Sequence, residues 1–543
     1  MTPSPAPTRT AQILRLSQRR FDVLVIGGGI TGAGIARDAA RRGLDVAVIE
    51  RDDFGSGTSS RSSRLVHGGV RYLEHGHLRL VFESSHERRV LLRIAPHLVQ
   101  PLPFTWPVYT GARVALWKLR AGLLLYDLLA LFKNVAPHRG LDAAGVADAE
   151  PMLQRTGLRG GARYFDAATD DARLTLATLL DAAVAGATIV NHAEVTGLRL
   201  AEGRARGVSV TDRLGGRAID VDASCIVNAT GPWTDGVRRM EDPTAASAVL
   251  GSKGAHIAVP AHRVGNRGAV TLLATDGRVM FVLPSGTCTI IGTTETATSG
   301  SPDEVRASRA DVDYLLASAN RAFPAAALTA DDVVAAWAGI RPLIAAGHAG
   351  DPSSASREHR VDTGPQGVIT VTGGKLTTYR VIGRDVVAAV FRALRRTPPR
   401  DRTADVPLIG GDIHDLAAEL AAARAATGAD DIATRLVHAH GGAWHQVWAR
   451  VQDEPTLGER LVSELPYVGA EVVHAVEAEL ACTLADVMIR RLHLAFEMRD
   501  QGRAVAPRVA ALMAPLLGWT DRGIALALVE YEREVQRLFS IDP

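Results

Sequence analysis

The sequence predicts an α/β protein with three parts: a nucleotide-binding domain built on a parallel sheet, an α+β domain inserted into it, and a helical C-terminal domain. Three observations predict this fold class. A strand, a glycine turn, a helix and a second strand fill residues 21–53, and strand-like and helix-like stretches then alternate to about residue 390. An Ala/Leu/Arg/Glu-rich segment with few strand signals follows. With 543 residues, the chain is also too long for one ordinary core.

Composition narrows the class of protein. Apolar residues make up 47% of the chain and charged residues 22%, which is typical of globular proteins. The formal net charge is only +2 and the basic residues are scattered, so nothing indicates nucleic-acid binding. Cys225, Cys288 and Cys482 lie far apart without a C-x-x-C pair, which favours a reducing compartment and predicts no metal site.

The first folded element is a βαβ unit. "DVLVIGG" (22–28) is an apolar, β-branched run followed directly by glycines, as in buried parallel strands. "TGAGIARDAARRG" (31–43) has helical spacing, and "LDVAVIE" (44–50) is a second strand. Residues 1–20 are expected to form a flexible tail; they have no apolar core segment or cleavage site, so no secretory signal is predicted.

The turn after the first strand carries a Rossmann-type dinucleotide fingerprint. Gly27, Gly29 and Gly32 form G-x-G-x-x-G, and Glu50 ends the next strand about 20 residues later. The helix N-terminus supplies free N–H groups for a pyrophosphate. Glu50 can accept hydrogen bonds from both ribose hydroxyls and would repel a 2′-phosphate, which disfavours NADP. The motif predicts a dinucleotide site without distinguishing FAD from NAD.

Three later segments favour a longer cofactor. "GTSSRSSRLVHGGVRYLE" (57–74) is dense in hydroxyls and glycines that can wrap a cofactor, although an ordinary serine-rich surface loop is the alternative. "VNATGPW" (227–233) ends a strand, and "TGGKLTTYR" (372–380) runs from a strand through a glycine turn into a helix. Such a helix start would face an anion or a flavin ring.

In this order, together with "IGTTE" and "GIRPL", these segments resemble the FAD-dependent glycerol-3-phosphate dehydrogenases, the aerobic, quinone-linked enzymes with a D-amino-acid-oxidase-like fold. The resemblance covers residues from about 20 to 390, and a helical C-terminal domain like that of the family follows. The expected division is an FAD-binding domain at 21–110, 165–235 and 335–395, a substrate or cap domain at 111–164 and 236–334, a linker at 396–412 and a helical domain at 413–543.

The resemblance implies dissociable FAD, since no cysteine or tyrosine stands out as a covalent anchor. The residues expected to contact the cofactor come from the glycine turn, the hydroxyl-rich loop and the two later strand ends. They are Gly27, Gly29, Thr31, Gly32, Glu50, Thr58, Ser59, Ser60, Ser62, Ser63, Arg64, Leu65, His67, Gly68, Gly69, Gly231 and Thr377.

The implied reaction oxidises C2 of sn-glycerol 3-phosphate to dihydroxyacetone phosphate, with hydride passing to the flavin. A dianionic phosphate requires fixed positive charge, and the planar fork of arginine suits phosphate oxygens. The substrate-binding candidates are basic or aromatic residues of the matching motifs: Arg71, Tyr72, Arg341, Arg357 and Lys375. Arg360 could take the place of Arg357 after a one-turn shift of the alignment.

His256, in the family-like segment "KGAH", is the candidate general base, because imidazole is neutral near pH 7 and can accept a proton. A hydrogen-bonded structural histidine in the cap is an equal alternative. Arg341 is expected to stabilise the alkoxide that develops at O2, and Lys375 completes the catalytic set.

The electron acceptor is left open between a membrane quinone, which the resemblance favours, and O2, as in glycerol-3-phosphate oxidases. "RVALWKLRAGLLLYDLLALFK" (113–133) has basic residues, Trp117 and many leucines, as in helices of the lipid headgroup layer, although a buried cap helix is the alternative. The resemblance favours a homodimer attached to the inner face of the cytoplasmic membrane. An amine oxidase of the D-amino-acid-oxidase type and a non-catalytic flavoprotein fit the Arg/Lys cluster less well.

Overall fold

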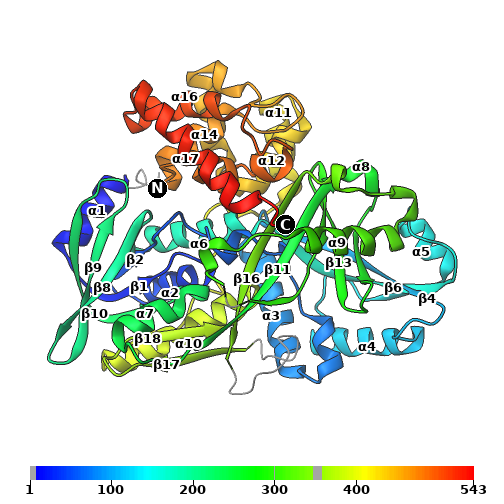
Figure 1. The fold of residues 1–543 in the computed structure, drawn as a ribbon, viewed down its shortest axis with the longest axis horizontal. Helices are drawn as coiled ribbons and strands as arrows, with labels where there is room; N and C mark the ends of the chain where they lie inside the picture. Colours follow the sequence, from blue (N-terminus) through cyan, green and yellow to red (C-terminus); the bar gives the residue numbers. More distant parts are fainter. Residues whose placement is uncertain (1–7, 299, 346–357) are drawn as a thin grey trace.

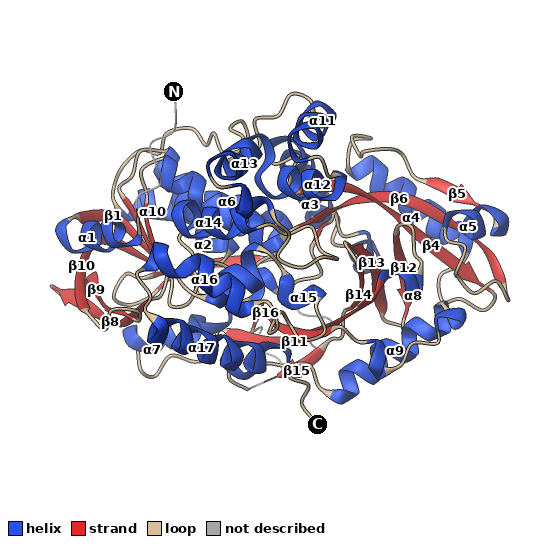
Figure 2. Ribbon diagram, turned by 90° about the horizontal axis from the view of Figure 1, so that it is seen from above, coloured by secondary structure: helices blue, strands red, loops and turns tan. Residues whose placement is uncertain are grey.

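The computed structural model of the protein describes residues 8–298, 300–345 and 358–543. Figure 1 shows two sheet-based regions side by side, with the C-terminal helices lying across the top of both. Seen from above in Figure 2, these helices cover the middle of the molecule, where the two regions meet.

The first sheet has a parallel centre. Its strands lie in the order β17 (His359–Thr363), β18 (Ile369–Gly373), β10 (Ala218–Asn228), β1 (Arg20–Ile26), β2 (Val46–Ile49) and β7 (Thr188–Val190). Strands from β18 to β7 pair in parallel, β17 is antiparallel, and the hairpin β8 (Ala193–Ala201) and β9 (Arg204–Asp212) joins through β10. Val23, Leu24 and Val25 of the central strand are fully buried, which explains the uninterrupted apolar run.

Helices α2 (Ile30–Arg41), α6 (Asp171–Val184) and α10 (Tyr379–Ala393) pack together on the first sheet. The predicted strand, helix and strand of residues 21–53 therefore form as expected, and so do the strands predicted to end in "VNATGPW" (227–233) and "TGGKLTTYR" (372–380). Short helices follow two of these strand ends: η3 (Gly231–Trp233) with α7 (Thr234–Glu241) after β10, and η8 (Leu376–Thr378) after β18.

The second sheet is mostly antiparallel. Its strands lie in the order β15 (Thr296–Thr298), β11 (Val249–Pro260), β14 (Cys288–Gly292), β13 (Val279–Ser285), β12 (Ala269–Leu273), β4 (Val99–Tyr109), β6 (Leu158–Thr169) and β3 (Leu65–Val66), with β16 (Ala335–Ile344) on β11 and β5 (Arg139–Leu141) on β6. The helices of this region are α3 (Leu78–Ile94), α4 (Leu116–Leu129), α5 (Ala143–Ala149), α8 (Ala261–Val264) and α9 (Arg309–Ala322).

Three strands of the ranges expected in the FAD-binding domain lie in the second sheet. The ranges 21–110 and 335–395 were expected in that domain, yet β3, β4 and β16 belong to the second sheet. Strand β16 pairs with β11 from Ala335 to Ile344, and β4 pairs with β6 along its whole length. An apolar strand run predicts a buried strand, but its partner depends on residues far away in the sequence.

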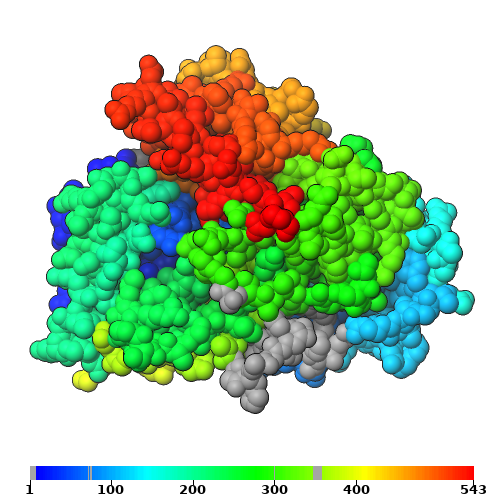
Figure 3. Space-filling view, in the orientation of Figure 1, coloured from blue at the N-terminus to red at the C-terminus, as the bar shows by residue number. Residues whose placement is uncertain are grey.

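The C-terminal region is helical. It contains α11 (Leu416–Thr427), α12 (Asp430–His440), α13 (Trp444–Asp453), α14 (Gly469–Glu479), a π-helical turn (Asp486–Arg491), α15 (Leu494–Glu497), α16 (Ala506–Leu517) and α17 (Asp521–Phe539). Residues 394–415, all of them described, connect α10 to α11 without a helix or strand. Figure 3 shows the helices of this region pressed against both sheet-based regions.

The flexible tail predicted for residues 1–20 is wrong for its second half. Arg9–Gln18 form helix α1, which the Thr8 hydroxyl caps by accepting the N–H of Ala11. Leu16 is fully buried, and Arg9 donates to Asp212 Oδ1 at 2.6 Å. The apolar residues of this segment are few, and only their packing on the first sheet makes the helix stable.

Glycines let α2 approach its neighbours closely. A Cβ atom on Gly383 of α10 would lie 2.8 Å from the backbone oxygen of Gly34, and one on Gly34 would lie 2.8 Å from the Tyr379 ring. The two helices therefore cross at backbone contact distance. This crossing fixes the N-terminus of α2 relative to the turn between β18 and α10.

We expect Gly383→Ala to lower the thermal midpoint, because overpacking at such a contact costs about 1–3 kcal/mol. Gly122→Ala in α4 is the matched control, since a Cβ there would meet nothing within 4 Å. Removing a helical glycine at an open position should raise stability by up to ~1 kcal/mol. Equal midpoints for the two variants in a thermal scan would contradict the close crossing.

Candidate active site

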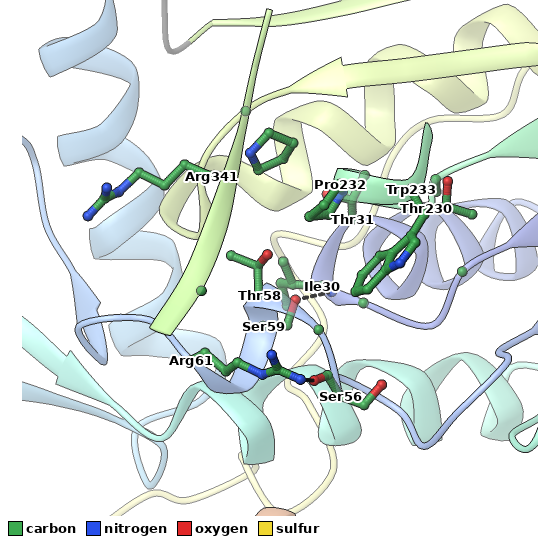
Figure 4. Close-up of a pocket in the computed structure, with 18 of the residues that line it drawn as sticks. Ile30, Thr31, Ser56, Thr58, Ser59, Arg61, Thr230, Pro232, Trp233 and Arg341 are labelled. Carbon is green, nitrogen blue, oxygen red and sulfur yellow. Dashed lines mark hydrogen bonds between the residues drawn. The ribbon is translucent and has the colours of Figure 1, made fainter. Parts of the chain in front are cut away.

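A cavity of about 440 Å³ lies where the carboxyl ends of the parallel strands face the second sheet. Ligands of open α/β sheets bind at this edge. The cavity is lined by the β1–α2 turn, the end of β2, the loop after it, the end of β10 and the turn before α10, and by His256 and Arg341 from the second sheet. Figure 4 shows the middle of this cavity, with Trp233 and Thr31 on one side and Arg341 on the other.

The glycine turn has no room for side chains. Gly27 has φ +107°, and a Cβ on it would lie 2.7 Å from the Ala229 backbone oxygen. A Cβ on Gly32 would lie 1.9 Å from the Gly27 backbone oxygen. Gly29 caps α2 without a side-chain hydrogen bond, while the Ser59 hydroxyl accepts the N–H of Ile30 at 2.9 Å (Figure 4). The start of α2 thus faces the cavity with its backbone, as an anion site requires.

Glu50 holds its carboxylate at the cavity wall. Its Oε2 accepts the N–H of Gly28 at 2.6 Å, and its Oε1 accepts the N–H of Asp52 at 2.9 Å. Burial raises the pKa of Glu50, and these two N–H groups oppose that rise. Each carboxylate oxygen retains a further lone pair, so Glu50 can still accept a hydrogen bond from a ligand hydroxyl.

His256 is buried between the two sheets. It pairs across the strands with Trp337, and the two rings stack with centroids 5.5 Å apart. Its Nε2 lies 2.8 Å from the Ser63 hydroxyl, and its Nδ1 has no hydrogen-bond partner among the described residues. Burial, with the positive charges of Arg341 and Arg64, lowers the pKa of His256 to about 3. The imidazole is therefore neutral at physiological pH.

Basic and aromatic side chains gather at the same end of the cavity. Arg341 of β16 donates to the Thr293 hydroxyl at 2.9 Å, and Figure 4 shows it extending away from the glycine turn. The Lys375 ammonium lies 3.6 Å from the centroid of the Tyr72 ring, a cation–π contact. Tyr72 in turn stacks loosely on His67, with centroids 6.5 Å apart. This arrangement suits an anionic ligand.

A second cavity of about 120 Å³ continues beyond these residues into the second sheet. Both cavities are lined by Ser63, Leu65, His67, Tyr72 and Arg341. The second one adds residues that are not among the predicted site residues, including Asp166, Arg278 and Thr293. Thr293 belongs to the quoted motif "IGTTE", whereas no sequence signal points to Arg278.

Most residues predicted for the site meet at the larger cavity. Those that line it are Gly27, Gly29, Thr31, Glu50, Thr58, Ser59, Ser62, Ser63, Leu65, His67, Tyr72, Gly231, His256, Arg341, Lys375 and Thr377. Trp233, Arg51 and Arg61 also line it, although none of them was predicted. Trp233 is the last residue of the quoted "VNATGPW", so this motif was the sequence signal that could have indicated it.

Other predicted residues lie around the cavity. Gly32 packs on the glycine turn, and Gly69 lines the second cavity. Ser60 and Arg64 do not line either cavity; the Arg64 guanidinium lies 4.8 Å from the Phe496 ring of the C-terminal region. Gly68 donates its N–H to Asp166 Oδ1 at 3.0 Å.

Arg357 and the side chain of Arg71 lie outside the described residues. The alternative to Arg357 that the sequence left open, Arg360, is 63% exposed and pairs with Asp362 at 2.7 Å. Arg360 therefore faces solvent rather than the cavity.

Comparisons with known proteins agree with this geometry. Residues 22–387 match a family model described as FAD dependent oxidoreductase, and residues 401–523 match one described as the C-terminal domain of alpha-glycerophosphate oxidase. The chain is 39% identical to a mitochondrial glycerol-3-phosphate dehydrogenase of Macaca fascicularis over 95% of this chain and 73% of that protein. It is 38% identical to a glycerol-3-phosphate dehydrogenase of Synechocystis sp. over 95% of this chain and 96% of that protein.

A solved structure is similar over the whole chain. The glycerol-3-phosphate dehydrogenase from Bacillus halodurans, complexed with FAD, is 30% identical with a TM-score of 0.81, covering 99% of this chain and 100% of that one. The predicted fold class and the predicted cofactor, FAD, are thereby confirmed. The chain belongs to the family of FAD-dependent glycerol-3-phosphate dehydrogenases.

Proposed function

We propose that this protein oxidises sn-glycerol 3-phosphate at C2 to dihydroxyacetone phosphate, with FAD in the larger cavity. The relatives named above as glycerol-3-phosphate dehydrogenases support this activity. The observation that carries it is the junction of the two cavities, where His67, Tyr72 and Arg341 line both. A substrate at this junction would lie between the cofactor and a group of positive charges.

The residues of the larger cavity fit FAD. The backbone at the start of α2 suits the pyrophosphate, and the half-buried carboxylate of Glu50 suits the adenosine ribose. A cofactor of this length would run from Glu50 past Ser59 toward Thr377, all of which line one cavity. When bound, FAD supplies the hydride acceptor at its flavin ring. We propose the other predicted cofactor-contact residues as well, because they lie in or around the same cavity.

The substrate residues act through charge. Arg341 and Lys375 supply fixed positive charge for the phosphate dianion and for the oxyanion that develops at O2. Tyr72 positions the Lys375 ammonium by the cation–π contact at 3.6 Å. Arg71 and Arg357 are proposed to contribute to the same group.

His256 is proposed to receive the proton of the C2 hydroxyl. Its Nε2 is 2.8 Å from the Ser63 hydroxyl, which lines both cavities and offers the path for that proton. A pKa of about 3 makes the free imidazole a weak base. A dianionic substrate beside Arg341 would offset the positive charge that contributes to this low value and so raise it.

We also propose that electrons leave the protein to a membrane quinone. Helix α4 buries Leu119, Leu123 and Tyr126 on one side. Its other side and the residues after it form an exposed apolar patch, the α4 patch, which consists of Trp117, Leu124, Leu128, Leu131 and Phe132. Each of these side chains is between 54% and 68% exposed. One face of α4 is thus buried, as the cap-helix interpretation predicts, and the opposite face is exposed and could contact a membrane.

The α4 patch supports peripheral attachment at the inner face of the cytoplasmic membrane. Lys118, Arg120 and Lys133 accompany it, and basic residues beside an apolar face favour anionic lipid surfaces. None of the described helices is long and apolar enough to span a bilayer. The homodimer and the division into cofactor and substrate domains stay predictions.

Glu50→Arg should leave the fold intact and reduce the FAD content of the purified protein, because the guanidinium removes the acceptor for the ribose hydroxyls. Losing two charged-group hydrogen bonds of about 1.5–3 kcal/mol each should weaken FAD binding by at least about a hundredfold. The measurement is flavin absorbance per protein, with circular dichroism to check folding. Full FAD occupancy in the variant would refute the ribose role.

His256→Ala should slow flavin reduction by about 10²–10⁴-fold in anaerobic stopped flow with glycerol 3-phosphate, as expected for a lost general base. His262→Ala, at an exposed position of α8, is the control. Because the pKa of His256 is lowered to about 3, the imidazole stays neutral as pH falls from about 8 to about 5. Therefore kcat/KM should not show the fall with a midpoint near pH 6.5 that protonation of an ordinary histidine would cause.

An unchanged reduction rate in His256→Ala would leave His256 as a structural residue. A fall of kcat/KM around pH 6.5 that disappears in the variant would contradict the neutral state instead. Flavin reduction by amino acids but not by glycerol 3-phosphate would reject the proposed activity itself.

Trp117→Glu combined with Leu128→Glu should abolish sedimentation with vesicles that contain an anionic phospholipid. Each apolar side chain contributes about 1.5–3 kcal/mol when buried, so partitioning should drop by about a hundredfold or more. Flavin reduction should stay unchanged. Leu200→Glu, at a leucine that is 52% exposed on the β8–β9 hairpin, is the control. If the double variant sediments like wild type, the α4 patch is not the membrane contact.

A further inference from the structure

The C-terminal helices reach the loop that follows β2. This segment, residues 50–63, is called the cofactor loop here, because Glu50, Thr58, Ser59 and Ser63 all line the larger cavity. Gly55 of the loop also donates its N–H to the Gly28 oxygen of the glycine turn at 3.0 Å. Any group that holds this loop therefore shapes the FAD site.

Two arginines of the C-terminal region hold the start of the loop. Asp53 is fully buried, and its Oδ2 accepts Arg490 Nε at 2.6 Å and Arg491 Nη1 at 2.6 Å. Arg491 Nη2 adds a contact to Oδ1 at 3.1 Å. Both arginines belong to the π-helical turn Asp486–Arg491, a rare geometry that often occurs at functional sites. Their exposures are 4% and 2%, so the pairing takes place away from water.

Further hydrogen bonds surround the contact of Asp53 with Arg490 and Arg491. Asn191, between β7 and β8, donates to Asp53 Oδ1 at 3.0 Å and to the Leu480 oxygen at 2.9 Å. Asp486 accepts Arg490 Nη2 at 2.7 Å and lies 2.9 Å from His192 Nε2. Two carboxylates thus face two guanidiniums. Removing one member would leave a buried charge without compensation.

The end of the loop is connected to the same region. Ser62 donates its N–H and its hydroxyl to Asp171 Oδ2 at 3.0 and 2.6 Å, at the start of α6. Arg173, in the same helix turn, forms a bidentate pair with Glu479 at 2.8 and 2.7 Å. Glu479 ends α14, a few residues before the π-helical turn. The start of the cofactor loop therefore contacts Arg490 and Arg491 directly, and its end is linked to Glu479 through the first turn of α6.

Two clusters of histidine and carboxylate side chains in this part of the molecule have the spacing of metal ligands, but arginines already bind their carboxylates. The ligand atoms of Asp53, His192 and Asp486 lie within 4.8 Å of one another, as do those of His440, His474 and Glu479. In the first group Arg490 and Arg491 already bind the carboxylates. In the second, Arg173 Nη2 lies 2.7 Å from Glu479 Oε1 and 3.1 Å from His440 Nδ1. Arginine guanidiniums supply the positive charge in both places.

We propose that Arg490 and Arg491 are positioning residues for FAD: by binding Asp53 they hold the cofactor loop in its FAD-binding shape, so that docking of the C-terminal helices and FAD binding stabilise each other. Such coupling is reciprocal, because each event must favour the other by the same factor. The inference requires FAD as the cofactor, but not the proposed substrate or electron acceptor. The coupling can be disproved while the proposed reaction stands, and the proposed reaction can be disproved while the coupling stands.

The test is a fluorescence titration of the FAD-free full-length protein with FAD. Arg491→Met and Asp53→Asn should each raise the Kd for FAD by about tenfold to a hundredfold, within the usual range of coupling between sites. Arg491→Lys, which keeps the charge, should recover part of the affinity. Turnover at saturating FAD should approach the wild-type kcat, since the arginines do not touch the substrate. The two losses should not multiply in the double variant, because both remove one contact.

Arg460→Met is the matched control. Arg460 forms a bidentate pair with Asp431 at 2.8 Å within the C-terminal region, so its loss should lower stability without changing the Kd for FAD. An unchanged Kd in both Arg491→Met and Asp53→Asn would overturn the proposal. An increase of the same size in Arg460→Met would also overturn it, because general destabilisation would then explain the effect.

Hydrogen exchange of the wild-type protein gives a second measurement that does not depend on the variants folding. FAD should slow amide exchange in residues 50–63 and also in residues 486–491, which lie outside the cavity. Protection confined to the cofactor loop would contradict the coupling.

Discussion

Backbone-to-backbone contact around α2 is the constraint on which the rest of the structure depends. Gly27 and Gly32 leave no space for a side chain in the turn after β1, and Gly34 meets Gly383 where α2 crosses α10. The N-terminus of α2 consequently faces the cavity at a fixed position, beside the ends of β10 and β18. The groups that hold a cofactor and those that would hold a substrate are arranged around this one helix start.

The cavity is electrically asymmetric. A half-buried carboxylate, Glu50, lies at one end, while Arg341 and Lys375 lie at the other. Burial also lowers the pKa of Arg61 to about 9, with the nearby arginines Arg537 and Arg490 adding to this effect. This separation suits a ligand whose ribose end donates hydrogen bonds and whose reacting end meets an anionic substrate. Burial, with the positive charges of Arg341 and Arg64 adding to it, lowers the pKa of His256 and keeps the imidazole neutral.

The three regions of the molecule depend on each other through buried or half-buried charges. Asp303, from the second region, binds Arg51 Nη2 at 2.5 Å and Trp233 Nε1 at 3.1 Å, and its backbone oxygen accepts Arg537 of α17. Asp53 likewise accepts hydrogen bonds from arginines, Arg490 and Arg491 of the π-helical turn. Both contacts lie within a few residues of Glu50. The Glu50 end of the cavity is therefore where the two sheet-based regions and the C-terminal helices meet.

Local patterns in the sequence were sufficient for the glycine turn, the parallel strands, Glu50 and the family, because each depends on neighbouring residues or on a motif of fixed spacing. Tertiary structure alone decided the partners of β4 and β16, the helix at Arg9–Gln18 and the surroundings of His256. The same holds for Asp53 and Arg490, which are 437 residues apart in the chain. Burial and charge pairing act through space, so no local pattern contains them.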